Sequence, residues 1–187
     1  IQYEGAQNIA AMIIEPVTGT NGILPPPAGY LRGLRDLLDK NGILLICDEV
    51  MAGFGRTGKM FAFEHGDIIP DIVTMAKGLT CGYIPLGAVG LRDPLARYFQ
   101  ENVFWGGLTY NSHTLACATA LAVLDVLEQE GLVERAASMQ GLMRSHMDAL
   151  AEKHPSFKTS RCIGLFGMID VQCDSAGTPA APYNGSS

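Results

Sequence analysis

The chain alternates short apolar runs with a segment of helical pattern. The apolar runs cover residues 10–17, 42–50, 71–76 and 85–91, and the helical pattern covers 31–40. Each run is continuously apolar instead of alternating with polar residues, which is typical of strands that are buried on both faces. Strands separated by helical segments commonly pair in parallel. The pattern therefore predicts an α/β fold, a mostly parallel sheet with helices on both faces.

The segment 31–40 carries one apolar stripe at helical spacing. Its members are Tyr30, Leu31, Leu34, Leu37 and Leu38. A stripe of this kind is expected on a helix that covers a sheet. Gly42 follows at the position where a glycine commonly ends a helix.

Past residue 110 two helices are predicted. The first begins near "LACATALAVLDVLEQEG" and is apolar or small nearly all round. Ser112 or Thr114 can cap its start, and Gly131 can end it. The second spans about 132–153, stops before Pro155, and has an apolar stripe of the kind that fills cores: Val133, Ala136, Met139, Met143, Met147 and Leu150.

A strand-like run at 162–171 follows these helices. We predict that residues 1–155 are part of a large domain and that 156–187 begin a small C-terminal domain that is incomplete here. Residue 1 directly precedes one strand-like run, and the chain stops soon after another. We therefore expect a piece of a longer protein, truncated at both ends.

Composition narrows the class of protein. The 187 residues are 48% hydrophobic and 17% charged, as in ordinary globular proteins, and the net charge is −6. An acidic chain without a basic cluster argues against a nucleic-acid partner. No run is long enough to span a membrane. The cysteines lack metal-ligand or disulfide spacing, so we expect no metal, and reduced thiols in a cytoplasmic protein: Cys47, Cys81, Cys117, Cys162 and Cys173.

The glycines of "GFGRTGKM", residues 53–60, fit two nucleotide-binding patterns. They have the G-x-G-x-x-G spacing of a dinucleotide loop and most of the G-x-x-x-x-G-K spacing of a phosphate loop. A phosphate loop needs a hydroxyl after its lysine, where this chain has Met60. Both loops should also open a helix, which Gly66 and Pro70 interrupt. The glycines are better explained as residues that permit a tight surface loop.

Two polar residues follow two of the apolar runs. Asp48 ends "ILLIC", and Lys77 follows "DIVTMA" between the small residues Ala76 and Gly78. Alone, Asp48 is best explained as a helix cap or a partner of Arg56. Together the two residues indicate a crevice, because ligands of open α/β sheets bind at the carboxyl ends of strands.

This pair suits pyridoxal phosphate chemistry. A desolvated lysine amine can form a Schiff base with the cofactor, and a carboxylate can keep the pyridine nitrogen protonated. The lysine can afterwards shuttle the substrate proton as a free amine.

The ordered set of "EP", "DEV", "GFGRTG", "AKG" and "GLTY" resembles the class III pyridoxal-phosphate aminotransferases of fold type I, over nearly the whole chain. The resemblance implies that Asp48 binds the pyridine nitrogen, Val50 packs on the ring and Lys77 carries the cofactor. It further implies that Thr109 binds the phosphate across a dimer interface and that Glu15 lies by the substrate. Met51 departs from the family, which often has glutamine there.

The resemblance implies transfer of an amino group from an ω-amino acid or amine, taurine- or β-alanine-like, to a 2-oxoacid. The full-length enzyme is expected to be a homodimer or a dimer of dimers, and the piece alone is expected to be inactive. An aminomutase or a racemase of the same fold shares Asp48 and Lys77, and a non-catalytic structural fragment is the alternative of another class. His65 and His113 are interpreted as loop or capping residues.

Overall fold

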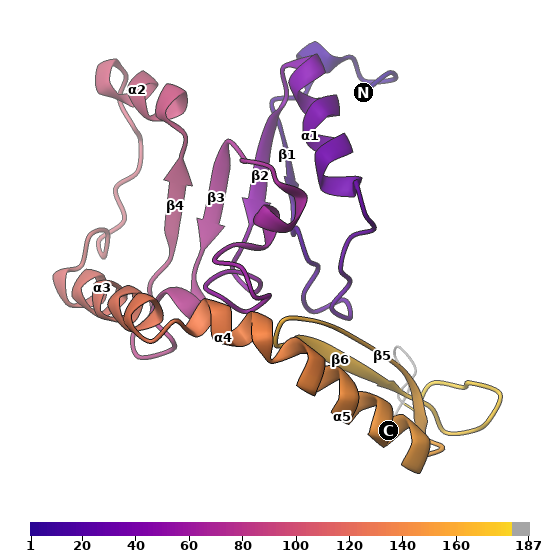
Figure 1. Cartoon of the computed structure of the whole chain (residues 1–187). Helices are drawn as coiled ribbons and strands as arrows, with labels where there is room; N and C mark the ends of the chain where they lie inside the picture. Colours follow the sequence, from indigo (N-terminus) through magenta and orange to yellow (C-terminus); the bar gives the residue numbers. More distant parts are fainter. Residues whose placement is uncertain (181–187) are drawn as a thin grey trace.

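The larger of two sheets has four strands in the order β1-β2-β3-β4. The computed structural model describes residues 1–180. The first three strands are parallel and the fourth pairs antiparallel with β3: β1 (Ala11–Ile14), β2 (Leu44–Asp48), β3 (Ile72–Met75) and β4 (Ala88–Leu91). In Figure 1 the arrowheads of β2 and β3 point toward the end of the sheet where α3 (Thr114–Gln129) and α4 (Leu132–Ser138) lie. The predicted α/β fold with a mostly parallel sheet is confirmed.

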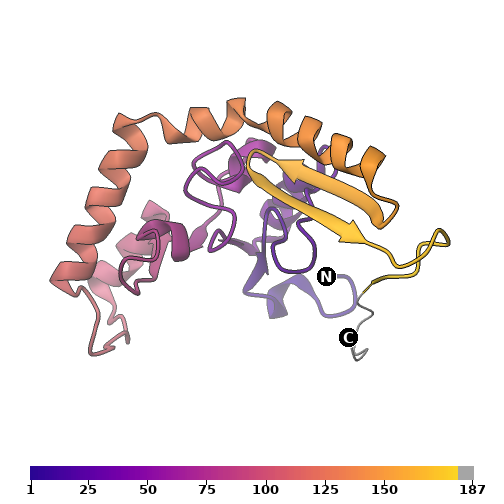
Figure 2. The ribbon, with the colours of Figure 1, turned by 90° about the horizontal axis from the view of Figure 1, so that it is seen from below.

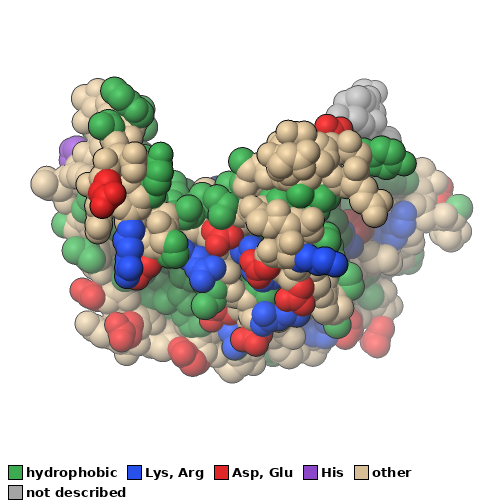
Figure 3. Space-filling model, turned by 90° about the horizontal axis from the view of Figure 1, so that it is seen from above, with side chains coloured by type: hydrophobic (Ala, Val, Ile, Leu, Met, Phe, Trp, Pro, Cys, Tyr) green, Lys and Arg blue, Asp and Glu red, His purple; other side chains and the backbone are tan. Residues whose placement is uncertain are grey.

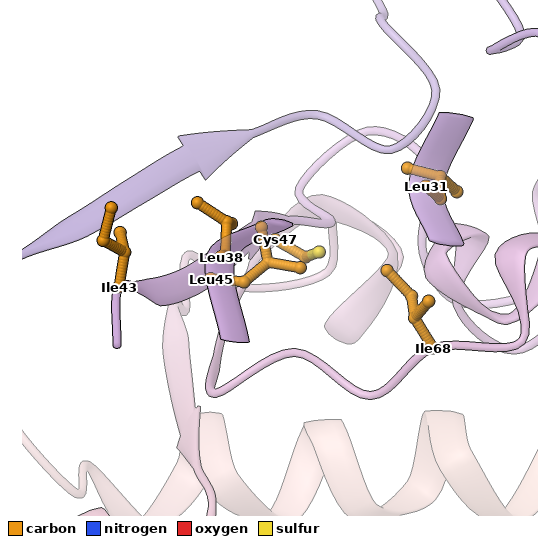
Figure 4. Close-up of a cluster of buried hydrophobic side chains, with 6 residues drawn as sticks. All are labelled: Leu31, Leu38, Ile43, Leu45, Cys47 and Ile68. Atoms are coloured by element: carbon orange, nitrogen blue, oxygen red, sulfur yellow. The ribbon is translucent and has the colours of Figure 1, made fainter. Parts of the chain in front are cut away.

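Helix α1 (Tyr30–Asn41) covers one face of this sheet. It ends as predicted, with Gly42 in the left-handed conformation at φ 65°. Its buried side chains and those of β2 form the core cluster in Figure 4: Leu31, Leu38, Ile43, Leu45, Cys47 and Ile68. Burying each large aliphatic side chain contributes about 1.5–3 kcal/mol, so this cluster is a main source of stability for the unit.

The predicted apolar stripe of α1 is partly wrong. Tyr30 and Leu37 are exposed, whereas Arg35 is buried. Arg35 can be buried because its guanidinium reaches Asp71, at 2.7 Å, just before β3. A buried charge is tolerated when it is paired and hydrogen-bonded, and periodicity alone does not reveal such a partner.

The opposite face of the sheet lacks the expected cover within residues 1–180. Ile13 of β1 and Val89 of β4 lie on this face and are 61% and 62% exposed. In Figure 3 hydrophobic side chains gather in the hollow between two projecting lobes. The continuous apolar pattern of the strands thus correctly predicted that both faces of the sheet are apolar. Helix α1 covers one of these faces.

The helices after β4 lie at both ends of the sheet, the first of them at the end opposite α3 and α4 (Figure 1). Helix α2 (Asp93–Glu101), with Pro94 in its first turn, was not predicted. Helix α3 (Thr114–Gln129) begins without a side-chain cap, so the predicted capping by Ser112 or Thr114 is wrong. Figure 2 shows α3, α4 and α5 in an arc.

The single helix predicted at 132–153 is two helices, α4 (Leu132–Ser138) and α5 (Gln140–Lys153). The interruption falls at Met139, between Ser138 and Gly141, which are weaker helix formers. The side-chain Oε1 of Gln140 accepts a hydrogen bond from the Gly164 N–H, so the break coincides with the contact to the next strand pair.

The strand-like run at 162–171 belongs to a hairpin instead of a single strand. Strands β5 (Phe157–Ile163) and β6 (Phe166–Val171) pair antiparallel and lie beside α5 (Figure 2). Gly164, at φ 57°, makes the turn between them. The boundary between a large domain at 1–155 and a small domain at 156–187 stays a prediction, and its last residues, 181–187, lie outside the described part.

Candidate functional site

The carboxyl ends of β2 and β3 bring two predicted site residues to one edge. Asp48 is the last residue of β2 and is paired in register with Thr74 of β3. Lys77 follows Thr74 by three positions and begins the short 3-10 helix η3 (Lys77–Leu79). The backbone N–H of Glu49 continues the pairing by donating to the Thr74 carbonyl at 2.9 Å. Asp48 and Lys77 therefore leave neighbouring strands at the same end of the sheet.

Lys77 has an unusual backbone conformation. Its φ is 43°, in the left-handed region that L-residues other than Asn and Asp seldom adopt. Such conformations cost about 1–3 kcal/mol and persist where the surrounding structure imposes them, frequently at functional sites. The side chain is exposed within the described residues, so the expected burial of this lysine is not found there.

Lys77 lines two cavities. The larger, about 1170 Å³, lies between the ends of β3 and β4 and the segment that precedes α3, and Thr74, Val89 and Tyr110 also line it. The smaller, about 350 Å³, lies between the glycine-rich loop and the β5–β6 turn. Its lining is mixed, with two cationic side chains beside apolar ones: Ile23, Met51, Arg56, Leu165, Phe166 and Gly167, together with Lys77. Lys77 therefore borders both cavities.

The Asp48 carboxylate has one oxygen engaged by its own turn. Oδ1 accepts the Val50 N–H at 3.0 Å, which fixes the orientation of the side chain. Asp48 does not line either cavity, but its register partner Thr74 lines the larger one. The Thr74 Oγ1 is buried and has no hydrogen-bond partner in the described part of the chain. An unpaired buried hydroxyl is unusual, so Thr74 Oγ1 can still form a hydrogen bond at this end of the sheet, next to the Asp48 carboxylate.

These donors and acceptors suit pyridoxal phosphate. An amine, a carboxylate and an unpartnered hydroxyl are grouped at one strand edge, next to space for a ring. The free Asp48 oxygen can accept from a protonated pyridine nitrogen, and Lys77 offers the amine that the aldehyde requires. The residues present therefore fit this cofactor.

Glu49 is fully buried immediately after Asp48. Its Oε2 accepts the Ala62 N–H and its Oε1 the Phe63 N–H, both at 2.9 Å. Burial raises the pKa of Glu49 to about 7, although the two N–H donors act to lower it. The charges of Glu64 and Asp48 raise the pKa further. Sequence reasoning treated Glu49 only as a neighbour of Asp48 and missed this arrangement.

The glycine-rich loop is a packing surface and not a phosphate loop. Only the short 3-10 helix η2 (Ala62–Gly66) follows it, so no long helix presents its amino end there. The Arg56 carbonyl accepts the Leu165 N–H, and Phe166 packs with Val17, Ala52 and Ala62 in a second core cluster. The preference for a glycine-shaped loop over a nucleotide site agrees with the structure, because the loop is occupied by contacts to the hairpin and to α4.

Gly58 shows why this loop needs glycine. Its φ is 82°, and a Cβ added there would lie 2.9 Å from the Ala137 Cα of α4. We expect Gly58→Ala to destabilise the protein by about 1–3 kcal/mol, through strain and steric overlap. Gly33→Ala is the matched control, because Gly33 lies inside α1 with open space around it, and it should stabilise by up to about 1 kcal/mol. Unfolding midpoints of the intact protein check both; a neutral Gly58→Ala would contradict the packing argument.

Glu15 and Thr109, like Asp48 and Val50, do not line either cavity. Glu15 follows β1, and its Oε2 accepts the Gly19 N–H at 2.8 Å, so it closes the turn after this strand. Thr109 is exposed, although its neighbours Leu108 and Tyr110 line the larger cavity. Asp48 and Val50 thus share the turn at the end of β2, Lys77 leaves the neighbouring strand β3 at the same end, and Glu15 forms its own turn after β1.

The two candidate loop histidines and Arg56 have simple surroundings. His65 Nε2 lies 3.0 Å from Thr57 Oγ1, so it braces the glycine-rich loop. His113 precedes α3 without capping it through its side chain and contacts the Tyr110 ring. Arg56 is exposed, and its predicted pairing with Asp48 is not formed within residues 1–180.

Comparison with known proteins identifies the family. A family profile described as aminotransferase class-III matches residues 1–182, and the chain belongs to this family. It is 40% identical over 181 residues to a diaminobutyrate–2-oxoglutarate transaminase of Halomonas elongata, covering 94% of this chain and 39% of the relative. It is 38% identical over 183 residues to a taurine–pyruvate aminotransferase of Bilophila wadsworthia, covering 92% and 39%.

A solved structure agrees with this assignment. The taurine:2-oxoglutarate aminotransferase of Bifidobacterium kashiwanohense, in complex with pyridoxal phosphate and glutamate, superposes with a TM-score of 0.93 at 44% identity. The match covers 99% of this chain and 42% of that one. The chain therefore spans about two fifths of the length of these relatives. In the described residues no helix is both long and apolar enough to cross a membrane.

Proposed function

We propose that the intact protein is a pyridoxal-phosphate-dependent transaminase that moves an amino group from an ω-amino acid or amine, taurine- or β-alanine-like, to a 2-oxoacid. The observation that carries the proposal is the placement of Lys77, in a left-handed turn between two cavities, beside the strand that ends at Asp48. Relatives named for taurine support the substrate class.

Each residue at this edge has a distinct role. The bound cofactor supplies an electron sink next to the amine-bearing carbon of the substrate. Lys77 holds the cofactor through its Nζ and, when its amine is free, moves the proton at that carbon. Asp48 keeps a proton on the pyridine nitrogen through a carboxylate oriented by the Val50 N–H. Val50 packs against the ring and Glu15 lies near the substrate.

A second copy of the protein completes the site in this proposal. Large apolar side chains are exposed along the segment from α2 to the start of α3: Tyr98, Phe99, Val103, Phe104, Trp105, Leu108 and Tyr110. An exposed apolar surface of this kind is typical of a protein interface. Thr109 lies within it, where it would bind the cofactor phosphate of the neighbouring subunit in a homodimer or a dimer of dimers.

The substrate assay tests transfer directly. The intact protein, loaded with pyridoxal phosphate, is incubated with taurine or β-alanine, with and without pyruvate or 2-oxoglutarate. We expect alanine or glutamate to form only when donor and 2-oxoacid are both present. Turnover of the donor without any 2-oxoacid would contradict transamination and would favour an aminomutase or a racemase, which share Lys77 and Asp48.

A further inference from the structure

Glu49 contacts the glycine-rich loop at both of its ends. Its carbonyl accepts the Gly53 N–H at 2.9 Å where the loop begins. Its carboxylate accepts the N–H groups of Ala62 and Phe63 where the loop ends. The single buried residue Glu49 therefore holds both ends of this loop next to the end of β2. Two hydrogen bonds from consecutive backbone N–H groups hold the same side chain, so this end of the loop is fixed in position.

The Glu49 side chain lies on the other side of the chain from the cofactor edge. Consecutive residues of an extended strand point to opposite faces, and Asp48 shares its face with Thr74. Glu49 instead packs fully buried against η2. Its carboxylate therefore cannot touch a ligand held by Asp48, and any influence on that ligand passes through the backbone and the loop.

The loop that Glu49 closes contacts the turn that carries Lys77. A Cβ added at Gly78 would lie 2.9 Å from the Phe54 Cβ, so this loop packs directly against the residue after Lys77. Met51 and Arg56, which lie in the same segment of the chain, line the smaller cavity together with Lys77. Glu49 can therefore influence the position of both proposed cofactor-binding residues. Asp48 is its neighbour in the chain, and the Lys77 turn packs against Phe54 of the loop that Glu49 holds.

We propose that Glu49 is a positioning residue for the cofactor site, which sets the placement of the Asp48 carboxylate and of the Lys77 turn through its two bonds to the backbone of η2. This inference rests on the proposed function. It assigns a role to a residue that would otherwise be only a buried carboxylate next to Asp48. Burying an ionisable side chain such as that of Glu49 is costly, and an apolar side chain of similar size would avoid that cost.

The test compares Glu49→Gln with Glu64→Gln in the intact protein. The amide of glutamine has one oxygen, so it can accept only one of the two N–H groups. Glu64 is the matched control because its Oε1 accepts the Phe61 N–H at the same 3-10 helix without reaching β2. The measurements are the affinity for pyridoxal phosphate, the pH midpoint of the visible absorption of the Lys77-bound cofactor, and hydrogen exchange at Ala62 and Phe63.

We expect Glu49→Gln to weaken cofactor binding about tenfold, because the loop loses one of its two hydrogen bonds to this side chain and holds Asp48 and the Lys77 turn less firmly. The absorption midpoint should move by roughly half a pH unit or more, because the charge at Asp48 is displaced. Exchange at Ala62 or Phe63 should accelerate. Glu64→Gln should leave the affinity and the midpoint unchanged.

Other outcomes overturn the inference. If Glu49→Gln accelerates exchange but keeps both cofactor readouts, Glu49 serves only the stability of the loop. If Glu49→Gln does not fold, Glu49→Asp replaces it, because the shorter side chain keeps the charge and cannot span to η2, and the same criteria apply. If the wild-type protein itself fails to retain the cofactor after borohydride reduction, the proposed function fails, which is distinct from a failure at Glu49.

Discussion

Replacement of Lys77 by alanine is expected to abolish covalent retention of pyridoxal phosphate. In the wild-type protein, borohydride should fix the cofactor to the chain and the visible absorption should disappear as the bond is reduced. Lys77 is the one lysine that lines either cavity. In the described residues no other lysine lines either cavity, so the aldehyde loses its attachment point, and turnover should fall at least about a thousandfold because the group that moves the proton is also lost.

The matched control for Lys77 is Lys59→Ala. Lys59 is an exposed lysine of the glycine-rich loop and belongs to neither cavity. It should retain the cofactor like the wild type, and mass spectrometry of the reduced protein should locate the label at residue 77. Equal labelling of wild type and Lys77→Ala would reject Lys77 as the attachment site and, with it, the proposed chemistry.

Replacement of Asp71 by asparagine is expected to give a large loss of stability, at the opposite end of the sheet. The Asp71 carboxylate binds the Arg35 guanidinium at 2.7 Å, the Arg92 guanidinium at 3.2 Å and the Leu45 N–H at 2.8 Å. It therefore connects α1, β2 and the segment after β4. Asparagine can keep one of these bonds but removes one of the two carboxylates that pair with the buried Arg35 guanidinium, the other being the exposed Asp39 at 2.6 Å, and we expect a loss of about 3 kcal/mol.

The pH dependence of this effect is defined by the pKa of Asp71. Burial acts to raise that pKa, but the Leu45 N–H and the Arg35 and Arg92 guanidinium groups lower it below the ordinary 3.8. A carboxyl with a lowered pKa stabilises the fold above its unfolded-state pKa, and this contribution is lost as pH falls through its folded-state pKa. The difference in unfolding free energy between wild type and Asp71→Asn should thus be full at neutral pH and shrink below about pH 4.

Asp93→Asn is the control for the ion-pair argument. Asp93 lies 3.8 Å from Arg97 with both side chains exposed to solvent. Exposed pairs contribute about 0–1 kcal/mol, so chemical unfolding of the intact protein should barely distinguish this variant from the wild type. If Asp71→Asn were equally mild, the buried network would not be a determinant of stability.

The two expectations involve opposite ends of the same strands. Asp71 precedes β3 and Lys77 follows it, so a single strand joins a stabilising ion network to the candidate catalytic turn. A residue in an unfavourable conformation, as Lys77 is, depends on a rigid support. In the folded fraction this support is still present, so Asp71→Asn should lower stability without removing covalent cofactor retention. Lys77→Ala should remove retention with little loss of stability.

Much of the site could be predicted because the relevant residues adjoin strong strand signals. Asp48 and Lys77 each follow an apolar run, and parallel strands bring their carboxyl ends to one edge. The sequence order of these residues also carried the family resemblance. The roles of Val50, Thr109 and Glu15 were predicted from the resemblance alone and stay predictions.

Other features depended on partners that are distant in sequence. The burial of Arg35 depends on Asp71, and the closure at Glu49 depends on the N–H groups of Ala62 and Phe63. A helical stripe or a strand end does not indicate which groups will approach it. The hairpin at 157–171 was read as one strand because its turn, at Gly164, is shaped by contact with Thr57.

The sequence by itself determined the strands, the helix that ends at Gly42, and the two residues at the carboxyl edge, because hydrophobic periodicity and turn chemistry are local properties. Only the tertiary structure decided that the glycine-rich loop packs on α4 and the hairpin, that Thr74 lies beside Asp48 with an unpaired hydroxyl, and that Glu49 closes the loop. The physical reason is that burial and hydrogen bonding depend on which distant segments meet, and chain topology sets those meetings.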